Sequence, residues 1–271
     1  MDVARCWPDV QALARDGAAR AHQWFREGAR WIEKGSGDWA SDADLEVEQM
    51  LRAGLRSIAP GTRIHGEESG LEEPQAGDSV YTWHVDPIDG SANFVRGIPH
   101  FATVISLTER RASGDEHILL GITVDPCRDE SFVAIEGRPT QLNGAPVRVA
   151  PPQSALRSVL AVVTPKPDVP YMELFSAWLA RQLPAFGGLR RSGAMALDLA
   201  WCACGRMDAF AGINLAPWDT RAGLIQVRNA GGAHCFSEII RSFPNPMPLS
   251  FCLVANSQSL LSKLSGDIHG S

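Results

Sequence analysis

The chain has 271 residues, of which 45% are apolar and 21% charged, a composition typical of a globular protein with a substantial core. Acidic residues outnumber basic ones by 31 to 25, which gives a net charge of −6, and no basic block stands out. This pattern argues against nucleic-acid binding. The longest apolar stretches, such as residues 118–124, are too short to span a membrane, so neither nucleic acid nor membrane is expected as a partner.

The first eight residues lack the basic-then-apolar pattern of a signal peptide. Six cysteines are scattered along the chain without CxxC spacing. Without an export signal, reduced thiols are the favoured state and the cytoplasm is the expected compartment.

Two helices are predicted at the start of the chain. Residues 10–32 carry apolar residues at near-helical spacing, and a polar loop at 34–38 follows. The segment Ser41-Asp42-Ala43-Asp44 resembles a capping box, which predicts a second helix through Leu55.

From Thr62 onward the pattern changes to short β-rich runs, separated by turn signals such as Leu142-Asn143-Gly144. The predicted strands of this part are 81–85, 102–107, 118–124, 131–135 and 158–163. The second half of the chain adds helices at 171–182, 194–204, 220–229 and 258–264, with strands at 208–213 and 251–255. These elements predict layered α and β structure in a single domain of residues 1–271, with two intimately packed lobes at about 1–150 and 151–271.

The most informative segment is Asp86-Pro87-Ile88-Asp89-Gly90-Ser91-Ala92-Asn93-Phe94, directly after the predicted strand 81–85. Two carboxylates, a glycine and a hydroxyl come between a strand and a helix start. This order brings hard oxygen ligands and backbone N–H groups to one spot. The segment therefore suits a divalent metal held beside a phosphate.

Further acidic residues recur at turns, namely Glu67 in Gly66-Glu67-Glu68-Ser69 and Asp219 after Trp218. Mg²⁺ prefers oxygen ligands and keeps several waters, and two ions about 3.5–4 Å apart can clamp both oxygens of a phosphoryl transfer. Carboxylates that converge without cations would repel one another and raise their own pKa values. The cluster therefore predicts either metal or an unusual proton arrangement.

Each acidic residue also has a plain structural interpretation. Asp86 before Pro87 starts a turn in that interpretation, and Asp219 caps the helix at 220–229. Asp44 is then only a member of a capping box, and Glu67 lies in a solvated loop. The order and spacing of the whole set favour the functional interpretation.

Taken in order, these motifs resemble the inositol monophosphatase family, of the lithium-sensitive sugar phosphatase type. The resemblance rests on Gly66–Ser69, Asp86–Phe94, Trp218-Asp219-Thr220-Arg221-Ala222-Gly223 and Ala230-Gly231-Gly232, with similar segments at 125–130 and 142–144. It extends from about Lys34 to Leu264. It implies a Mg²⁺-dependent phosphomonoesterase of α+β class, built as a layered α-β-α-β-α sandwich.

The resemblance also implies a ligand set for two Mg²⁺ ions. Glu67, Asp86 and the Ile88 carbonyl, with the Ser91 hydroxyl, would hold the first ion and its water. Asp86, Asp89 and Asp219 would hold the second ion, which stabilises the leaving alkoxide. The first ion would lower the pKa of the water that attacks phosphorus in line.

Catalytic and phosphate-binding roles follow from the same resemblance. Gly90 and Ser91 would offer backbone N–H groups to the phosphate oxygens. Asp44 would hydrogen-bond Ser91 and help to orient or deprotonate the attacking water. Glu67, Asp44 and Ser91 are therefore the catalytic candidates.

The substrate pocket departs from the family pattern at two positions. Inositol-specific members carry a Glu near residues 209–214, where alignment back from Asp219 places Gly212. In Ser192-Gly193-Ala194-Met195-Ala196, Met195 stands where a small residue is usual, although it can also pack in the core. The candidate pocket residues are Gly193, Ala194, Met195 and Gly212. A pocket without the charged partner should bind inositol phosphate less selectively.

The predicted function is hydrolysis of inositol monophosphate or a related sugar or polyol phosphate. Alternative substrates are histidinol phosphate, fructose-1,6-bisphosphate and 3′-phosphoadenosine-5′-phosphate. A bacterial branch of the family also binds the transcription machinery, so a non-enzymatic role with that partner is a further alternative. The family often forms homodimers, and a homodimer is expected here.

Overall fold

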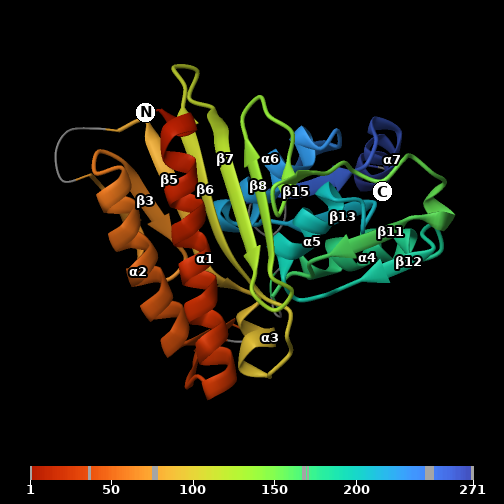
Figure 1. The fold of residues 1–271 in the computed structure, drawn as a ribbon. Helices are drawn as coiled ribbons and strands as arrows, with labels where there is room; N and C mark the ends of the chain where they lie inside the picture. The colour runs from red at the N-terminus through yellow and green to blue at the C-terminus, as the bar shows by residue number, and fades with distance from the viewer. Residues whose placement is uncertain are drawn as a thin grey trace.

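The structure, a computed structural model, describes residues 2–35, 38–74, 79–166, 169, 171–241 and 247–269. Helices and sheets alternate across the molecule in the order helices, sheet, helices, sheet, helices (Figure 1). The predicted α+β class and α-β-α-β-α layering are therefore confirmed. Within the described ranges, no helix combines the length and apolar character needed to cross a bilayer.

The first helix differs from its prediction at both ends. Helix α1 (Val3–Glu27) runs through Pro8, which removes one backbone donor without ending the helix. Gly28 ends it, because its positive φ of 88° suits a residue without a Cβ. The predicted range 10–32 was wrong for these reasons, and the chain turns into a strand where the helix was expected to continue.

A hairpin and a second helix follow α1. Strands β1 (Trp31–Gly35) and β2 (Asp38–Ser41) pair antiparallel, so the predicted loop at 34–38 was mostly wrong, and its residues 36 and 37 lie outside the described residues. Helix α2 (Asp42–Ile58) begins at the predicted capping box, where Asp44 Oδ2 accepts a hydrogen bond from the Ser41 N–H at 2.7 Å. Helices α1 and α2 together cover one face of the larger sheet (Figure 1).

The larger sheet has the strand order β10-β9-β8-β7-β6-β5-β3-β4, and its neighbours are antiparallel except for the parallel pair β3 and β5. Its strands are β3 (Arg63–Gly66), β4 (Gly70–Glu72), β5 (Tyr81–Asp89), β6 (Ala102–Arg110), β7 (Glu116–Asp125), β8 (Glu130–Ile135), β9 (Gln141–Leu142) and β10 (Ala145–Pro146). Strand β5 extends four residues beyond the predicted range 81–85, and its register shifts between Asp86 and Asp89. Both carboxylates therefore lie on the irregular end of a strand, and not in a turn after it.

The smaller sheet has the order β12-β11-β13-β15-β14. Its strands are β11 (Val159–Val162), β12 (Gly188–Arg190), β13 (Ala209–Ile213), β14 (Ala233–Arg241) and β15 (Met247–Ala255), and a short 3₁₀ helix, η1 (Ala155–Arg157), precedes β11. Helices α5 (Met195–Ala203) and α6 (Pro217–Asn229) lie between the two sheets (Figure 1). Helices α4 (Met172–Gln182) and α7 (Gln258–His269) cover the outer face of the smaller sheet (Figure 1). Helix α3 (Ser91–Val95) is a short helix after β5. In this half of the chain three predicted elements were too short, because α6 begins three residues earlier, β15 begins four residues earlier and α7 ends five residues later than expected. Strands β12 and β14 were not predicted.

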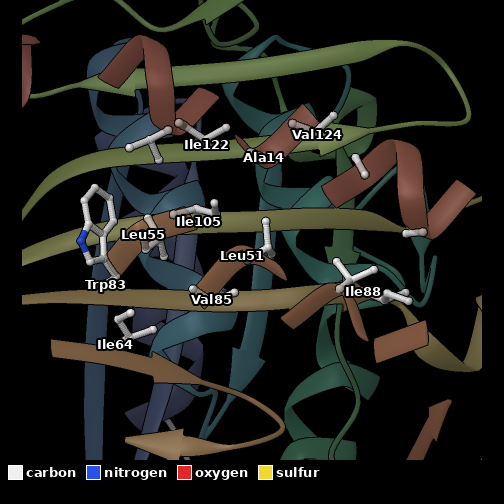
Figure 2. Packing of buried hydrophobic residues seen from close by; sticks show 14 of the residues in the cluster. Ala14, Leu51, Leu55, Ile64, Trp83, Val85, Ile88, Ile105, Ile122 and Val124 are labelled. Carbon is white, nitrogen blue, oxygen red and sulfur yellow. The ribbon is translucent and has the colours of Figure 1, made fainter. Parts of the chain in front are cut away.

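A large apolar core fills the space between α1, α2 and the larger sheet (Figure 2). Leu51 and Leu55 of α2 are fully buried there beside Trp83 and Val85 of β5. Each such side chain contributes roughly 1.5–3 kcal/mol when it leaves water. The Ile88 side chain belongs to the same core, so the strand end that carries the two aspartates is anchored by apolar packing.

Candidate active site between the two sheets

The four predicted acidic residues line one cavity of about 630 Å³. Glu67 follows β3, Asp86 and Asp89 end β5, and Asp219 lies in the first turn of α6. The predicted residues Ile88, Gly90 and Ser91 line the same cavity. A cavity of similar volume, about 660 Å³, opens beside the start of α1, and none of the four acids lines it. The chemistry-bearing residues are thus gathered at one place in the fold.

Backbone N–H groups hold the three aspartates in place. Asp86 Oδ1 accepts from the Ile88 N–H at 3.0 Å, which shapes the irregular end of β5. Asp89 accepts from the first turn of α5, with the Met195 N–H at 3.0 Å and the Ala196 N–H at 2.7 Å. This contact joins the two halves of the chain at the cavity floor, where the positive end of the α5 dipole favours a carboxylate.

Asp219 caps helix α6 and also lines the cavity, so both interpretations of this residue from the sequence apply. It is the third residue of α6, where its Oδ2 accepts from the Ala216 N–H at 3.0 Å. It therefore helps to cap the helix, from inside its first turn and not from before it. The same side chain lines the cavity.

Burial and mutual repulsion raise the pKa values of these acids. Burial raises the pKa of Asp86 well above its usual value, and the charges of Glu67, Asp89 and Asp219 raise it further. Burial likewise raises the pKa of Asp89 and that of Asp219 to about 7. A site that holds so many buried carboxylates favours either bound protons or a bound cation.

The donor set fits Mg²⁺, which takes hard oxygen ligands, and the residues able to supply them are Glu67, Asp86, Asp89, Asp219 and the Ile88 carbonyl. Across the described ranges, no three Asp, Glu, His or Cys side chains already form a group arranged to hold one ion. This finding does not count against Mg²⁺, because that ion keeps several waters and needs only one or two carboxylates from the protein. The fit rests on donor chemistry and on the raised pKa values.

A hydroxyl–carboxylate pair lies at the edge of the acidic cluster. The Ser91 hydroxyl lies 3.1 Å from Asp44 Oδ1 and 3.0 Å from the Ile88 carbonyl, and it can donate to either. Asp44 is buried, and its other oxygen accepts from the Ser41 N–H and hydroxyl at 2.7 and 2.6 Å. Asp44 is thus a capping residue and also the hydrogen-bond partner of Ser91. Ser91 itself is at the cavity wall, whereas Asp44 lies behind it.

The loop before α5, which carries the predicted pocket residue Gly193, is held against α3 and so lies close to the acids. Asn93 Nδ2 donates to the carbonyls of His100 and Ser192, at 2.8 and 3.0 Å. Gly90 has a φ of 95°, and a Cβ at that position would lie 3.0 Å from the Gly193 carbonyl oxygen. Only a residue without a side chain allows this close approach.

The predicted substrate residues divide into two groups. Gly193 and Met195 line the cavity, and Met195 also packs partly against the core between the sheets. Ala194 is fully buried, and the structure does not place Ala194 or Gly212 in the cavity wall. A Cβ at Gly212 would lie 2.7 Å from Leu215 Cδ1, so the space beside this glycine is already filled.

Several cavity residues escaped the sequence-based prediction. These are Thr164, Lys166, Arg191, Asn214 and Trp218. Trp218 lies in the first turn of α6, and the other four lie in loops of the second half, where no local motif indicates which side chains turn toward the acids. Behind the cavity, the ion pair of Glu48 and Arg52 was also missed. Its sequence signal was two charged residues four apart on the otherwise apolar face of α2.

Known proteins resemble this chain along nearly its full length. Residues 8–261 match the model of the inositol monophosphatase family. An inositol-1-monophosphatase of Caulobacter vibrioides is 37% identical over 201 residues, which cover 74% of this chain and 76% of that protein. The Nus factor SuhB of Pseudomonas aeruginosa is 36% identical over 206 residues, which cover 74% of this chain and 73% of that protein.

Solved structures share the fold. The extragenic suppressor protein SuhB of Bartonella henselae has a TM-score of 0.84 with 29% identity, and the match covers 98% of each chain. An inositol monophosphatase of Anabaena has a TM-score of 0.76 with 25% identity, covering 99% of this chain and 96% of that chain. The ordered motifs, the shared cavity of their acidic residues and these matches agree. The chain belongs to the inositol monophosphatase family.

Proposed function

We propose that this protein is a Mg²⁺-dependent phosphatase that hydrolyses a small phosphomonoester, such as inositol monophosphate or a related sugar or polyol phosphate. The observation that carries the proposal is that four acids line one cavity, of which Asp86 and Asp89 are buried and Glu67 and Asp219 are partly buried. The raised pKa values of the three aspartates support it, because an added cation would stabilise their ionised forms.

These four acids and the Ile88 carbonyl would hold the ions. The chemistry that bound Mg²⁺ supplies is Lewis acidity, which lowers the pKa of the attacking water and offsets charge on the phosphate and the leaving oxygen. Asp89 keeps its orientation through two backbone N–H groups of α5, and its oxygens retain further lone pairs for a ligand role.

Ser91 and Asp44 would accept the proton that the attacking water loses. The Ser91 hydroxyl can accept a proton at Oγ while it donates its own to Asp44 Oδ1, 3.1 Å away. The two hydrogen bonds from Ser41 hold the Asp44 carboxylate in this orientation. Gly90 and Ser91 begin α3 at the cavity wall, so their backbone N–H groups would help to seat the phosphate.

Phosphate release from a panel of substrates tests the proposal. The panel contains inositol-1-phosphate, fructose-1,6-bisphosphate, histidinol phosphate and 3′-phosphoadenosine-5′-phosphate, each with Mg²⁺ and with EDTA. We expect Mg²⁺-dependent turnover of at least one compound and loss of most activity in Asp89→Asn. Glu73→Gln is the matched control, since Glu73 pairs with Arg63 at the surface and does not line the cavity. Folded protein that turns over none of the four compounds would contradict the proposal.

A partner-binding role is the second candidate, because some relatives carry the name Nus factor SuhB. Binding to purified components of the transcription machinery tests it, with wild-type protein and with Asp89→Asn. Binding that survives in the variant, together with no turnover of the panel, would favour this role over catalysis. Light scattering of the same samples tests the expected homodimer.

A further inference from the structure

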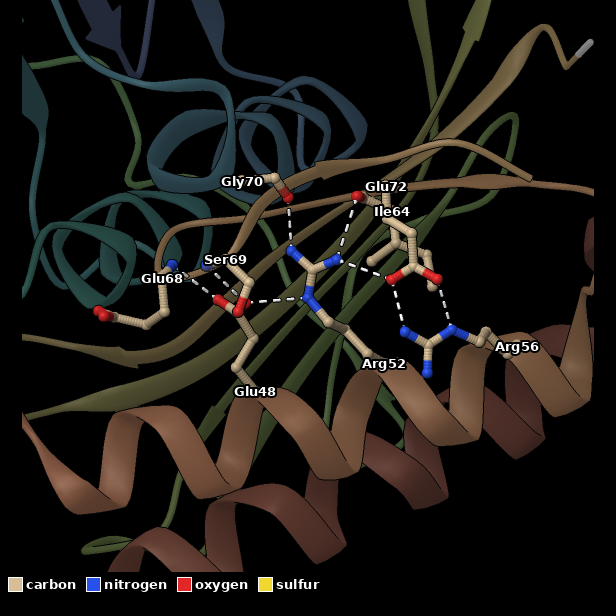
Figure 3. A network of polar contacts seen from close by, with 8 residues as sticks. All are labelled: Glu48, Arg52, Arg56, Ile64, Glu68, Ser69, Gly70 and Glu72. Carbon is tan, nitrogen blue, oxygen red and sulfur yellow. Dashed lines mark hydrogen bonds and ion pairs between the residues drawn. The ribbon is translucent and has the colours of Figure 1, made fainter. Parts of the chain in front are cut away.

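The loop that carries Glu67 is bound from behind by a buried carboxylate of α2 (Figure 3). Glu48 is fully buried, and its Oε2 accepts from the Glu68 N–H at 2.8 Å. Its Oε1 accepts from the Ser69 N–H at 3.0 Å. Two consecutive backbone N–H groups directly after Glu67 therefore point at one carboxylate. Hydrogen bonds to an ionised acceptor are the strong kind.

Arg52 forms hydrogen bonds to Glu48 and to the backbone on both sides of this loop. Its Nε donates to Glu48 Oε1 at 2.9 Å, which offsets the buried negative charge. Its terminal nitrogens donate to the Gly70 carbonyl at 2.5 Å and lie 3.4 Å from the Ile64 carbonyl. Ile64 belongs to β3 and Gly70 begins β4. Arg52 thus joins α2 to β3 and to the start of β4, the two strands between which the loop runs.

The contact between loop and carboxylate is close, and it leaves little freedom for Glu67. A Cβ at Gly66 would lie 2.5 Å from Glu48 Cδ, so only glycine allows the chain to pass over this carboxylate. On the other side, the Glu67 N–H donates to the Val85 carbonyl at 3.2 Å, one residue before Asp86. The backbone of Glu67 is therefore held between Glu48 and the strand that carries Asp86.

We propose that Glu48 is a positioning residue that fixes the Glu67 loop in the conformation needed for divalent-cation binding. The inference rests on the proposed function, in which Glu67 is a ligand. A buried ion pair is costly to desolvate and adds little stability compared with apolar packing, so stability alone does not account for one at this place. A residue that holds a ligand in place typically changes metal affinity by about 10–100-fold when it is altered.

Calorimetric titration of Mg²⁺ into purified, folded protein tests the proposal, with wild type, Glu48→Gln and Arg56→Gln. Arg56→Gln is the matched control, because Arg56 pairs with Glu72 in the same network, and among the described residues no hydrogen bond or ion pair joins it to Glu48 or to residues 67–69. We expect Glu48→Gln to raise the Kd for Mg²⁺ about 10-fold or more. The Kd of Arg56→Gln should equal that of wild type. In turnover, Glu48→Gln should raise the Mg²⁺ concentration for half-maximal rate more than it lowers kcat at saturating Mg²⁺.

A double-mutant cycle separates positioning from general stability. In a Glu67→Gln background, the change Glu48→Gln should weaken Mg²⁺ binding little further, because the ligand it positions is already lost. If Glu48→Gln does not fold, Glu48→Asp keeps the charge and shortens its reach, and it should show an intermediate rise in Kd.

Three results would overturn the inference. A lowered Tm with an unchanged Kd in Glu48→Gln would show a purely structural role, and so would an additive cycle. Wild-type protein that binds no Mg²⁺ would overturn the proposed function and this inference together. Wild-type binding with an unaltered variant would overturn only the positioning role.

Discussion

Two groups of buried acidic residues in this molecule are compensated in opposite ways. Glu48 has its counter-charge built into the fold, since Arg52 lies 2.9 Å away on the same helix. Asp86 and Asp89 are also buried and Asp219 is partly buried, but the charges of neighbouring acids raise their pKa values. In the part of the chain that the structure describes, no salt bridge to Arg or Lys is found for these three aspartates, although the charge of Lys166 lowers the pKa of Asp219.

The difference separates a structural site from a binding site. A buried carboxylate with its own arginine is complete without a ligand, whereas buried carboxylates that repel one another favour protons or a cation from solution. The two groups also touch, because Glu48 binds the loop of Glu67 and Glu67 raises the pKa of Asp86. The compensated group thus supports the uncompensated one.

The largest expected effect comes from breaking the compensated pair. Arg52→Met leaves Glu48 buried without its counter-charge, which should lower the free energy of unfolding by about 3–5 kcal/mol. Chemical denaturation measures this loss. The double variant Glu48→Gln/Arg52→Met should recover part of it, because no charge remains buried. A single variant that loses less than about 1 kcal/mol, the size of an exposed pair, would contradict the account.

Removing a charge from the uncompensated group should have the opposite effect on stability. Asp219→Asn keeps an oxygen for the Ala216 N–H but removes one buried negative charge. The metal-free variant should therefore melt at or above the wild-type Tm at pH 8. Its kcat/KM should fall more than about 100-fold, since residues that merely support metal ligands already cost 10–100-fold. A variant with wild-type activity would remove Asp219 from the ligand set.

The pH dependence of stability tests the same difference without any substrate. The pKa of Asp219 is about 7 in the folded protein and about 3.9 when unfolded. The folded state therefore binds more protons between these values, and the contribution of Asp219 to stability is lost as pH rises from about 4 to 7.

The loss amounts to about 1.4 kcal/mol per pH unit at most for this one group. The buried imidazole of His84, whose pKa is about 3, acts in the opposite direction below its unfolded value, so wild type must be compared with Asp219→Asn. The free energy of unfolding of Asp219→Asn should rise relative to that of wild type as pH increases to 7. Above pH 7 the difference between the two proteins should stay constant. A gap that is constant with pH would refute the raised pKa of Asp219.

The smallest expected effect concerns the outer end of the Arg52 network. Arg56 and Glu72 are paired at 2.5 Å, but both are partly exposed to solvent. Arg56→Gln should change the free energy of unfolding by about 0–1 kcal/mol, because water and salt screen such a pair. Chemical denaturation of this variant and of Arg52→Met under the same conditions measures the change. Equal losses of unfolding free energy in the two variants would mean that burial does not determine how much each ion pair contributes to stability.

Local motifs in the sequence predicted the acids but not what surrounds them. The segment from Asp86 to Phe94 and the acid at Asp219 indicate oxygen ligands. The layered fold was predicted from the family resemblance. The pocket residue Gly212 could not be judged from spacing alone, because whether its vacant side-chain position faces the cavity depends on Leu215, which fills it. Strand β14 was missed, because its pairing with β15 is a tertiary contact.

The central claim is that the uncompensated acids form a cation site, and calorimetric titration of Mg²⁺ at pH 7 in two buffers of different ionisation enthalpy tests it most directly. With Asp89 and Asp219 near half-protonation at that pH, Mg²⁺ should bind wild type and release roughly one proton or more per chain, while Asp219→Asn should bind more weakly and release fewer. Folded wild-type protein that shows no binding at millimolar Mg²⁺, or that binds without releasing protons, would contradict the account.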